Sequence, residues 1–448
     1  MVGSLSKIVT LNQINYLIAI TVFALTAIWC IPNTIAARYS LLFILYILLI
    51  VTKNIRINWG DPLFKTLLIF ISYLILSIFL PSNDYLLVIK NIKSEWLKFI
   101  IFAIAGFSLA FIRCNKLKIL LLLGLGFSII SYIYLALFII SGETSHPKII
   151  EHHGYIAYSS LTSTILLFPL LIYGNLKKNV NTIIVITLLI NMVAVIVSNS
   201  RGGILFNILV IVLNLIIYIY LFRKLNVIRK ILLSIFFLVF IIGSFNIILL
   251  KNQDNKWKNL LNVIYLIKID NPLDLLCNGT ENFRRNNEIN GKVNKNLDDA
   301  ITDLQNEGTA ARLITAMVSF ELLKDNWFGK NVDTKNSFRL ELEKVCNRIP
   351  KISLANSHNG WLDITHAFGI IGTCIFMLFF IYPIIISFKF MSQVTNTDYL
   401  ITVNLFTFTL IWACRGFVDA TMRDHMLEMQ GFIIFYLYGL FRQIKKDN

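Results

Sequence analysis

Long apolar runs recur along the whole chain, separated by short polar connections. Most of them are roughly 17 to 25 residues long, enough for a helix to cross a hydrocarbon core of about 30 Å. The twelve candidate spans lie near 12–31, 38–52, 63–80, 97–112, 118–140, 156–174, 180–198, 203–222, 230–250, 359–388, 399–415 and 429–441. The pattern predicts an all-α polytopic membrane protein with about twelve transmembrane helices.

Basic residues concentrate in every second connection and in the C-terminal tail. They are Lys53, Arg56, Arg113, Lys116, Lys118, Lys177, Lys178, Arg223, Lys224, Arg229, Lys230, Arg442, Lys445 and Lys446. Because Lys and Arg favour the cytoplasmic side of a membrane, we expect these connections and both termini to be cytoplasmic.

One long polar segment, residues 251–357, interrupts the series and falls on the outer side by the span count. We therefore expect three parts: helices 1–9 in residues 1–250, a large outer loop in 251–357, and helices 10–12 in 358–448. Within the loop, residues 309–323 predict an amphipathic helix whose apolar face is Leu313, Met317, Phe320 and Leu323.

Composition agrees with a membrane protein, since the chain is 56% hydrophobic and only 15% charged. Its net charge of +16 is largely explained by the loops that set the topology, so nothing points to a nucleic-acid partner. The six cysteines show no metal-ligand spacing. Cys277 and Cys346 both lie in the large loop, where they either form a disulfide or remain two free thiols.

The short outer connections carry more basic residues than the positive-inside tendency favours. Arg201 follows a polar turn and precedes Gly202 and Gly203, in an apolar stretch that must break there because a buried arginine is costly. Lys93 and Lys98 lie at the start of the fourth span, and Arg415 lies at the end of the eleventh, where it could pair with Asp419. An anionic ligand at the outer surface is the simplest explanation.

A histidine stands where the polar loop meets the tenth span. His358 and Asn359 are followed at fixed spacing by Gly369 and Gly372. With the Arg201 turn and the large loop, this arrangement resembles the bacterial O-antigen ligases and their relatives, the O-antigen polymerases and protein O-oligosaccharyltransferases. Arg312, ahead of the 326–329 segment Asn-Trp-Phe-Gly, is similar to another motif of that family, with Trp327 where proline is usual.

The resemblance implies a GT-C-like glycosyltransferase architecture and a specific reaction. An O-antigen polysaccharide on undecaprenyl diphosphate would move to a sugar hydroxyl of the lipid A–core acceptor. This would occur at the periplasmic face of the inner membrane of a Gram-negative bacterium, among its lipids. Neither a metal nor another cofactor is implied.

The residue chemistry suits such a transfer. A histidine titrates near neutral pH, so His358 is the expected base that takes the acceptor proton. Arginine matches phosphate oxygens in a fork, so Arg312 and Arg201 are expected to stabilise the leaving diphosphate. Asn359, Lys98, Lys93 and Arg415 are the expected substrate-binding residues.

Each assignment has a structural alternative. His358 could simply start a helix that Asn359 caps, Arg312 could be a solvated residue, and Arg201 could anchor a turn at the interface. Lys93 and Lys98 could extend their charged ends to the membrane surface. His366, deeper in the same span, is expected to be a hydrogen-bonded core histidine.

Three other functions remain open on the sequence. A polymerase usually divides its outer polar mass between two loops, and a protein O-oligosaccharyltransferase is generally longer at its C-terminus. A lipid-linked glycan transporter or flippase would show internal repeats and polar groups at mid-membrane. Here the polar groups gather on one face, which favours the ligase.

Overall fold

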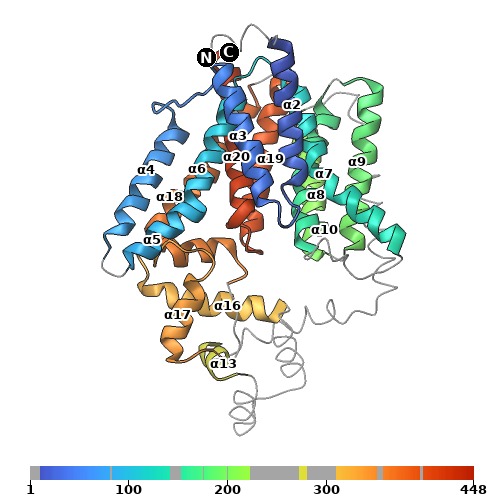
Figure 1. Ribbon diagram of the computed structural model, residues 1–448. Helices are drawn as coiled ribbons and strands as arrows, with labels where there is room; N and C mark the ends of the chain where they lie inside the picture. Colours follow the sequence, from blue (N-terminus) through green and yellow to red (C-terminus); the bar gives the residue numbers. More distant parts are fainter. Residues whose placement is uncertain are drawn as a thin grey trace.

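The computed structural model describes residues 11–80, 83–141, 153–174, 176–198, 200–221, 272–279, 309–350, 357–393 and 397–447. The described residues form helices and connections without a strand. The helices of the bundle are α2 (Leu11–Ile28), α3 (Ile35–Val51), α4 (Pro62–Ile78), α5 (Tyr85–Asn91), η1 (Ile92–Trp96), α6 (Leu97–Leu109), α7 (Lys116–Ser141), α8 (His153–Tyr173), α9 (Lys178–Val197), α10 (Arg201–Leu221), α18 (Gly360–Met391), α19 (Thr397–Gly416) and α20 (Asp424–Asp447). Below this bundle in Figure 1 lie α13 (Pro272–Asn278), α16 (Thr309–Leu322), η3 (Leu323–Asp325) and α17 (Ser337–Cys346), here called the loop subdomain.

The helices agree with the predicted spans. Six of them are long and apolar enough to cross a membrane: Lys116–Ser141, Gly154–Tyr173, Lys178–Val197, Arg201–Ile219, Gly360–Met391 and Asp398–Gly416. Three shorter apolar helices are Asn12–Ile28, Ile35–Val51 and Pro62–Ile78. The chain is therefore an α-helical polytopic membrane protein. The ninth expected span, 230–250, lies outside the described residues, so the count of twelve stays a prediction.

The first residue of α2 and the last residue of α20 lie at the same end of the bundle, opposite the loop subdomain (Figure 1). At the other end, the indole nitrogen of Trp29, just after α2, donates to the carbonyl of His425 in the first turn of α20 at 2.8 Å. This geometry agrees with two termini on one side. Which side faces the cytoplasm stays a prediction.

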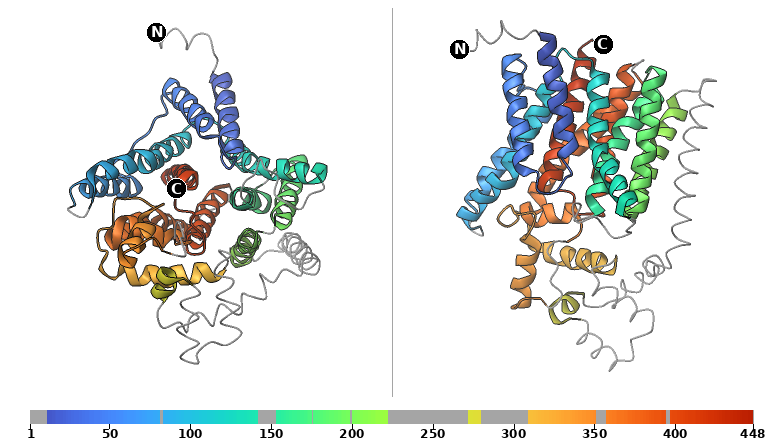
Figure 2. Two further views of the ribbon diagram at one scale, coloured as in Figure 1. Left: turned by 60° about the horizontal axis from the view of Figure 1, so that its bottom comes forward. Right: turned by 45° about the vertical axis from the view of Figure 1, so that its right-hand side comes forward.

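Helix α20 lies in the middle of the bundle, surrounded by the other long helices (Figure 2). It packs most closely on α6, where a methyl group added at Gly106 would collide with the carbonyl of Phe432. Aromatic rings fill the layer around this contact, including Trp29, whose ring centroid is 4.9 Å from that of Phe102. Such close backbone approach through small residues is a common way for membrane helices to associate.

In the loop subdomain, Cys277 and Cys346 form a disulfide that joins α13 to α17, with their Cα atoms 5.4 Å apart. The structure thus decides between the two states that the sequence left open.

The amphipathic helix predicted at 309–323 is present as α16, but its predicted face was partly wrong. Ile314 and Val318 are fully buried, whereas Phe320 is 65% exposed. The buried face also contains the polar residues Thr315 and Ser319. Residues 313, 317 and 320 lie next to residues 314 and 318 on the surface of the helix. Hydrophobic periodicity alone therefore could not show which of the two rows is buried.

Helix α18 is broken at Gly369, whose φ of 69° and ψ of −177° are outside the helical range. Segment 326–329 of the loop subdomain occupies the break. The amides of Ile370 and Ile371, which would otherwise bond within the helix, donate to the carbonyls of Asn326 at 3.2 Å and Trp327 at 3.3 Å. A side chain at Gly369 would collide with the Trp327 backbone, so only glycine fits here.

Candidate active site

Three parts of the chain meet at the turn formed by residues 417–419, directly after α19. The Asn359 side-chain amide donates to the Phe417 carbonyl at 2.8 Å. The amide of Gly360 donates to the Asp419 carbonyl at 3.0 Å, and Arg312 Nη1 donates to the Val418 carbonyl at 3.3 Å. The turn therefore joins the start of α18 to α16 of the loop subdomain.

Asn359 is the N-cap of α18, as the sequence suggested. Its Oδ1 accepts hydrogen bonds from the amides of Trp361 at 3.0 Å and Leu362 at 3.1 Å. These two amides have no partner within the helix, so an asparagine cap satisfies them. His358 comes directly before this cap, is half-buried and has a φ of 55°. A non-glycine residue with positive φ is uncommon and frequently marks a functional site.

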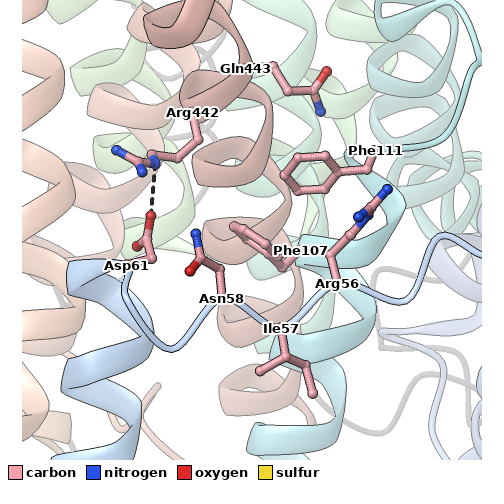
Figure 3. Close-up of a pocket in the computed structure, with 8 residues that line it drawn as sticks. All are labelled: Arg56, Ile57, Asn58, Asp61, Phe107, Phe111, Arg442 and Gln443. Carbon is pink, nitrogen blue, oxygen red and sulfur yellow. Dashed lines mark ion pairs between the residues drawn. The ribbon is translucent and has the colours of Figure 1, made fainter.

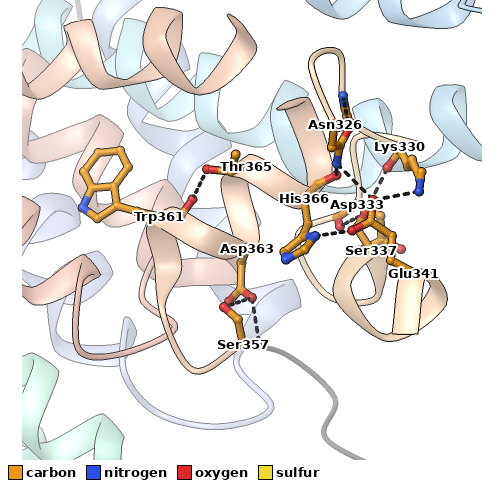
Figure 4. A network of polar contacts seen from close by, with 11 residues as sticks. Asn326, Lys330, Asp333, Ser337, Glu341, Ser357, Trp361, Asp363, Thr365 and His366 are labelled. Atoms are coloured by element: carbon orange, nitrogen blue, oxygen red, sulfur yellow. Dashed lines mark hydrogen bonds and ion pairs between the residues drawn. The ribbon is translucent and has the colours of Figure 1, made fainter. Parts of the chain in front are cut away.

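The loop before α18 is fixed by a buried carboxylate, as Figure 4 shows. Asp363 Oδ1 accepts hydrogen bonds from both the amide of Ser357 at 2.9 Å and its hydroxyl at 2.7 Å. Because Ser357 and Asn359 are both held, the backbone on either side of His358 is anchored.

Arg415 and Asp419 form the ion pair expected from the sequence, with Nη2 and Oδ2 3.2 Å apart. The Tyr158 hydroxyl donates to the same carboxylate oxygen at 2.8 Å. The Arg415 guanidinium lies against two rings, 5.1 Å from the centroid of Tyr158 and 4.9 Å from that of Phe206. Arg415 is only 2% exposed, and its Nε and Nη1 make no hydrogen bond within the described residues.

The Arg201 turn lies beside this pair. An ideal Cβ at Gly202 would be 3.2 Å from Arg415 Nη2, so α10 begins in contact with the buried guanidinium. Arg201 is the first residue of α10 and is half-buried. Of the predicted site residues, His358, Asn359, Arg312, Arg415 and the Arg201 turn are thus gathered around the 417–419 turn.

The charges at this turn depend on Asp419, which lies between the two arginines Arg415 and Arg312. Burial raises the pKa of the Asp419 carboxyl, but Arg415, Arg312 and the Tyr158 hydroxyl outweigh burial and hold its pKa below the usual value. The carboxylate is consequently ionised at neutral pH. Among the described residues, this carboxylate thus lies within the electrostatic influence of two guanidinium groups, those of Arg415 and Arg312.

A second polar network supports the broken part of α18 (Figure 4). Nδ1 of buried His366 is hydrogen-bonded to the Glu341 carboxylate of α17, and Lys330 Nζ lies 2.9 Å from the same carboxylate. Burial raises the pKa of Glu341, but the bonds and charges of His366 and Lys330 outweigh it and lower that pKa. His366 is thus the hydrogen-bonded core histidine that the sequence predicted.

Two predicted binding residues lie away from the 417–419 turn. Lys98 Nζ is 5.3 Å from the ring centroid of Tyr39, whose hydroxyl donates to Glu428 at 2.6 Å. Lys93 is exposed on the π-helical segment η1. No contact of either lysine with the turn is found in the part of the chain that the structure describes.

Sequence reasoning missed two residues that make buried polar contacts, Arg38 and Tyr158. Arg38 is buried and pairs with Glu428 at 3.3 Å, although it was counted only as the start of an apolar span. A buried arginine in an otherwise apolar run was an available signal. Tyr158 gave no signal, because tyrosines are common in membrane helices.

The described residues contain no cluster of three or more His, Cys, Asp or Glu side chains that could hold a metal ion.

Two comparisons with known proteins bear on this geometry. No curated protein matches the chain. Residues 184–377 match the family model described as O-Antigen ligase, a range that contains Arg201, Arg312, His358 and Gly369. Arg415 and Asp419 follow that range. Residues 184–377 are therefore similar to the O-antigen ligase family.

Proposed function

We propose that this protein is an O-antigen ligase of the bacterial inner membrane. It transfers an O-antigen polysaccharide from undecaprenyl diphosphate to a sugar hydroxyl of lipid A–core. In this proposal the 417–419 turn and the loop subdomain face the periplasm, and both termini are cytoplasmic. The observation that carries the proposal is the convergence of Asn359, Arg312 and Arg415 beside His358.

The reaction forms two bonds and breaks two. The acceptor hydroxyl oxygen attacks the anomeric carbon and loses its proton to His358. The bond between that carbon and the diphosphate oxygen breaks, and the diphosphate leaves with the electron pair. An anchored histidine is suited to the proton transfer, because its neutral form is a good base near pH 7.

Negative charge grows on the leaving diphosphate, and the arginines are proposed to stabilise that charge. Arg312 and Arg201 are proposed to bind its oxygens, while Arg415 adds a buried positive charge. Preorganised cations in a site shielded from water are often the largest catalytic contribution. This chemistry requires neither a nucleotide sugar nor a metal ion. Lys93 and Lys98 are proposed to contact lipid phosphates as the donor approaches.

An O-antigen polymerase and a protein O-oligosaccharyltransferase would use the same chemistry with another acceptor. The ligase is favoured because α13, α16 and α17 all come from one large loop segment. A lipid-linked glycan flippase is a more distant alternative, and a histidine held beside several arginines at one face gives it little support.

Deleting the gene and separating the lipopolysaccharide by gel electrophoresis distinguishes these functions. Loss of a ligase leaves core without O-antigen while lipid-linked polymer accumulates. Loss of a polymerase leaves core with a single repeat unit. Complementation with His358→Ala, at equal protein level in the membrane, should fail to restore the ladder. Full restoration would exclude His358 as the base.

A further inference from the structure

A second site lies at the opposite end of the bundle, where α4 begins and α20 ends. It is a cavity of about 430 Å³ that does not touch the 417–419 turn. Its lining residues are Arg56, Ile57, Asn58, Asp61, Phe107, Phe111, Arg442 and Gln443, drawn in Figure 3.

The cavity has an excess of one positive charge. Asp61 caps α4 by accepting from the amide of Leu63 at 3.0 Å, and it receives the Tyr438 hydroxyl at 2.8 Å. Arg442 Nε lies 2.8 Å from the other oxygen of this buried carboxylate. The Asp61 charge is therefore already balanced by Arg442.

Arg56 is the additional cation. Its backbone is fixed, since its amide donates to the Ser108 hydroxyl at 3.1 Å. Its guanidinium forms no ion pair with any residue that the structure describes, and Figure 3 draws it in the cavity lining beside Phe107 and Phe111. Asn58 adds an amide donor to the lining beside Asp61, and its Oδ1 accepts from the amide of Gly60 at 3.2 Å.

Part of the cavity lining, beside Arg56, is apolar. The rings of Phe107 and Phe111 have centroids 5.0 Å apart, and Ile57 extends the same surface. A ligand that uses the whole cavity must combine an anionic group with apolar carbon. A free phosphate would use only the cations, whereas the phosphate and glycerol of a phospholipid would use both.

We propose that this cavity binds the phosphate headgroup of an anionic phospholipid, with Arg56 as its main cation. The location fits, because the cavity lies at the ends of membrane helices, where headgroups are found. Basic pockets between membrane helices are a recurrent site for anionic lipids. The proposal is independent of the transferase activity.

Native mass spectrometry of the full-length protein in detergent tests this site. Short-chain phosphatidylglycerol is titrated against phosphatidylcholine, for wild type, Arg56→Gln and the control Lys53→Gln. Lys53 is exposed in the same connection but does not line the cavity. We expect phosphatidylglycerol to be preferred and Arg56→Gln to weaken its binding about tenfold, with Lys53→Gln unchanged.

Three results would overturn the proposal. The first is equal phosphatidylglycerol binding by Arg56→Gln and wild type, the second is no preference over phosphatidylcholine, and the third is equally effective competition by inorganic phosphate. An unchanged unfolding temperature of Arg56→Gln, measured without added lipid, establishes that any loss of binding comes from the site and not from misfolding.

Discussion

Arg415 and Asp419, four residues apart, form an ion pair with 3.2 Å between the guanidinium and the carboxylate. Asn359 and Arg312 contact the same 417–419 turn. The 417–419 turn, which contains Asp419, joins the end of α19 to the start of α18 and to the loop subdomain. Arg415 is almost fully buried, so the stability of the site depends on the Asp419 carboxylate.

Replacing Asp419 by asparagine should therefore destabilise the protein and abolish transfer. The substitution leaves the buried Arg415 charge without its partner, which typically costs about 3 kcal/mol. The apparent unfolding temperature in detergent measures the effect. Tyr158→Phe is the matched control, since it removes a single hydrogen bond to the same oxygen and should cost about 1 kcal/mol. Equal unfolding temperatures for Asp419→Asn and wild type would contradict the prediction.

Arg312→Lys should retain the fold but lose transfer activity by roughly tenfold to a hundredfold, because lysine keeps the charge without the fork that grips a diphosphate. Glycan transfer in a reconstituted assay is the measurement. Arg339→Lys, an exposed arginine of α17 paired with Glu343, provides the control and should stay active. Wild-type activity of Arg312→Lys would argue against bidentate diphosphate binding.

Gly369→Ala should separate segment 326–329 from the break in α18. The added methyl group meets the Trp327 backbone, and the positive φ adds strain, so we expect a loss of at least about 2 kcal/mol. Thermal unfolding reports the change. Gly60→Ala is a suitable comparison, because a Cβ there would meet only the Asn58 side chain at 3.3 Å. Similar unfolding temperatures for the two variants would show that the segment does not depend on this glycine.

Reducing the Cys277–Cys346 disulfide should loosen the attachment of α13 to α17. The bond joins residues separated by 69 positions, and closing a loop of that size typically stabilises a protein by about 2 to 4 kcal/mol. Limited proteolysis with and without reductant should reveal faster cleavage near α13 after reduction. Cys277→Ser should behave like the reduced protein, whereas mutation of Cys374, an exposed free cysteine, should not.

Acidification should destabilise the protein partly through His425, which precedes the apolar part of α20. Burial, with the charge of Arg38 and Arg423, lowers the pKa of His425 to about 4. The unfolded chain therefore takes up the proton first, and this contribution to stability is lost as pH falls from about 6.5 to 4.

The carboxylates of Asp419 and Glu341, whose pKa values are lowered, also lose stability on acidification. Unfolding temperatures of wild type and His425→Phe across pH 7 to about 4 separate the contributions. The variant should show the weaker pH dependence, by up to about 3 kcal/mol over this range. Parallel curves for the two proteins would exclude a role for His425.

The sequence predicted most of the fold, because the length of an apolar run is itself the requirement for crossing a bilayer. Every predicted span in the described residues coincides with a helix. The sequence also predicted the Asn359 cap and the Arg415–Asp419 pair, since both are local contacts. Spacing within one segment was sufficient for each of them.

Contacts between distant segments could not be predicted in the same way. The bond from Arg312 to the Val418 carbonyl joins residues 106 positions apart and has no local signature. Likewise, the tenth apolar run reads as one continuous helix, because the segment that occupies its break lies some forty residues earlier. The roles proposed for His358, Arg312 and Arg201 remain predictions.

The break at Gly369 also affects how this protein can be divided and recombined. The residues before it, 360–368, bond to the 417–419 turn and pack beside α17, whereas those after it continue into the bundle. A chimera that exchanges the large loop with that of a relative should therefore cross over after Ile371, whose amide bonds to Trp327, rather than at His358. The chimera would then carry segment 326–329 together with the part of α18 to which this segment is hydrogen-bonded.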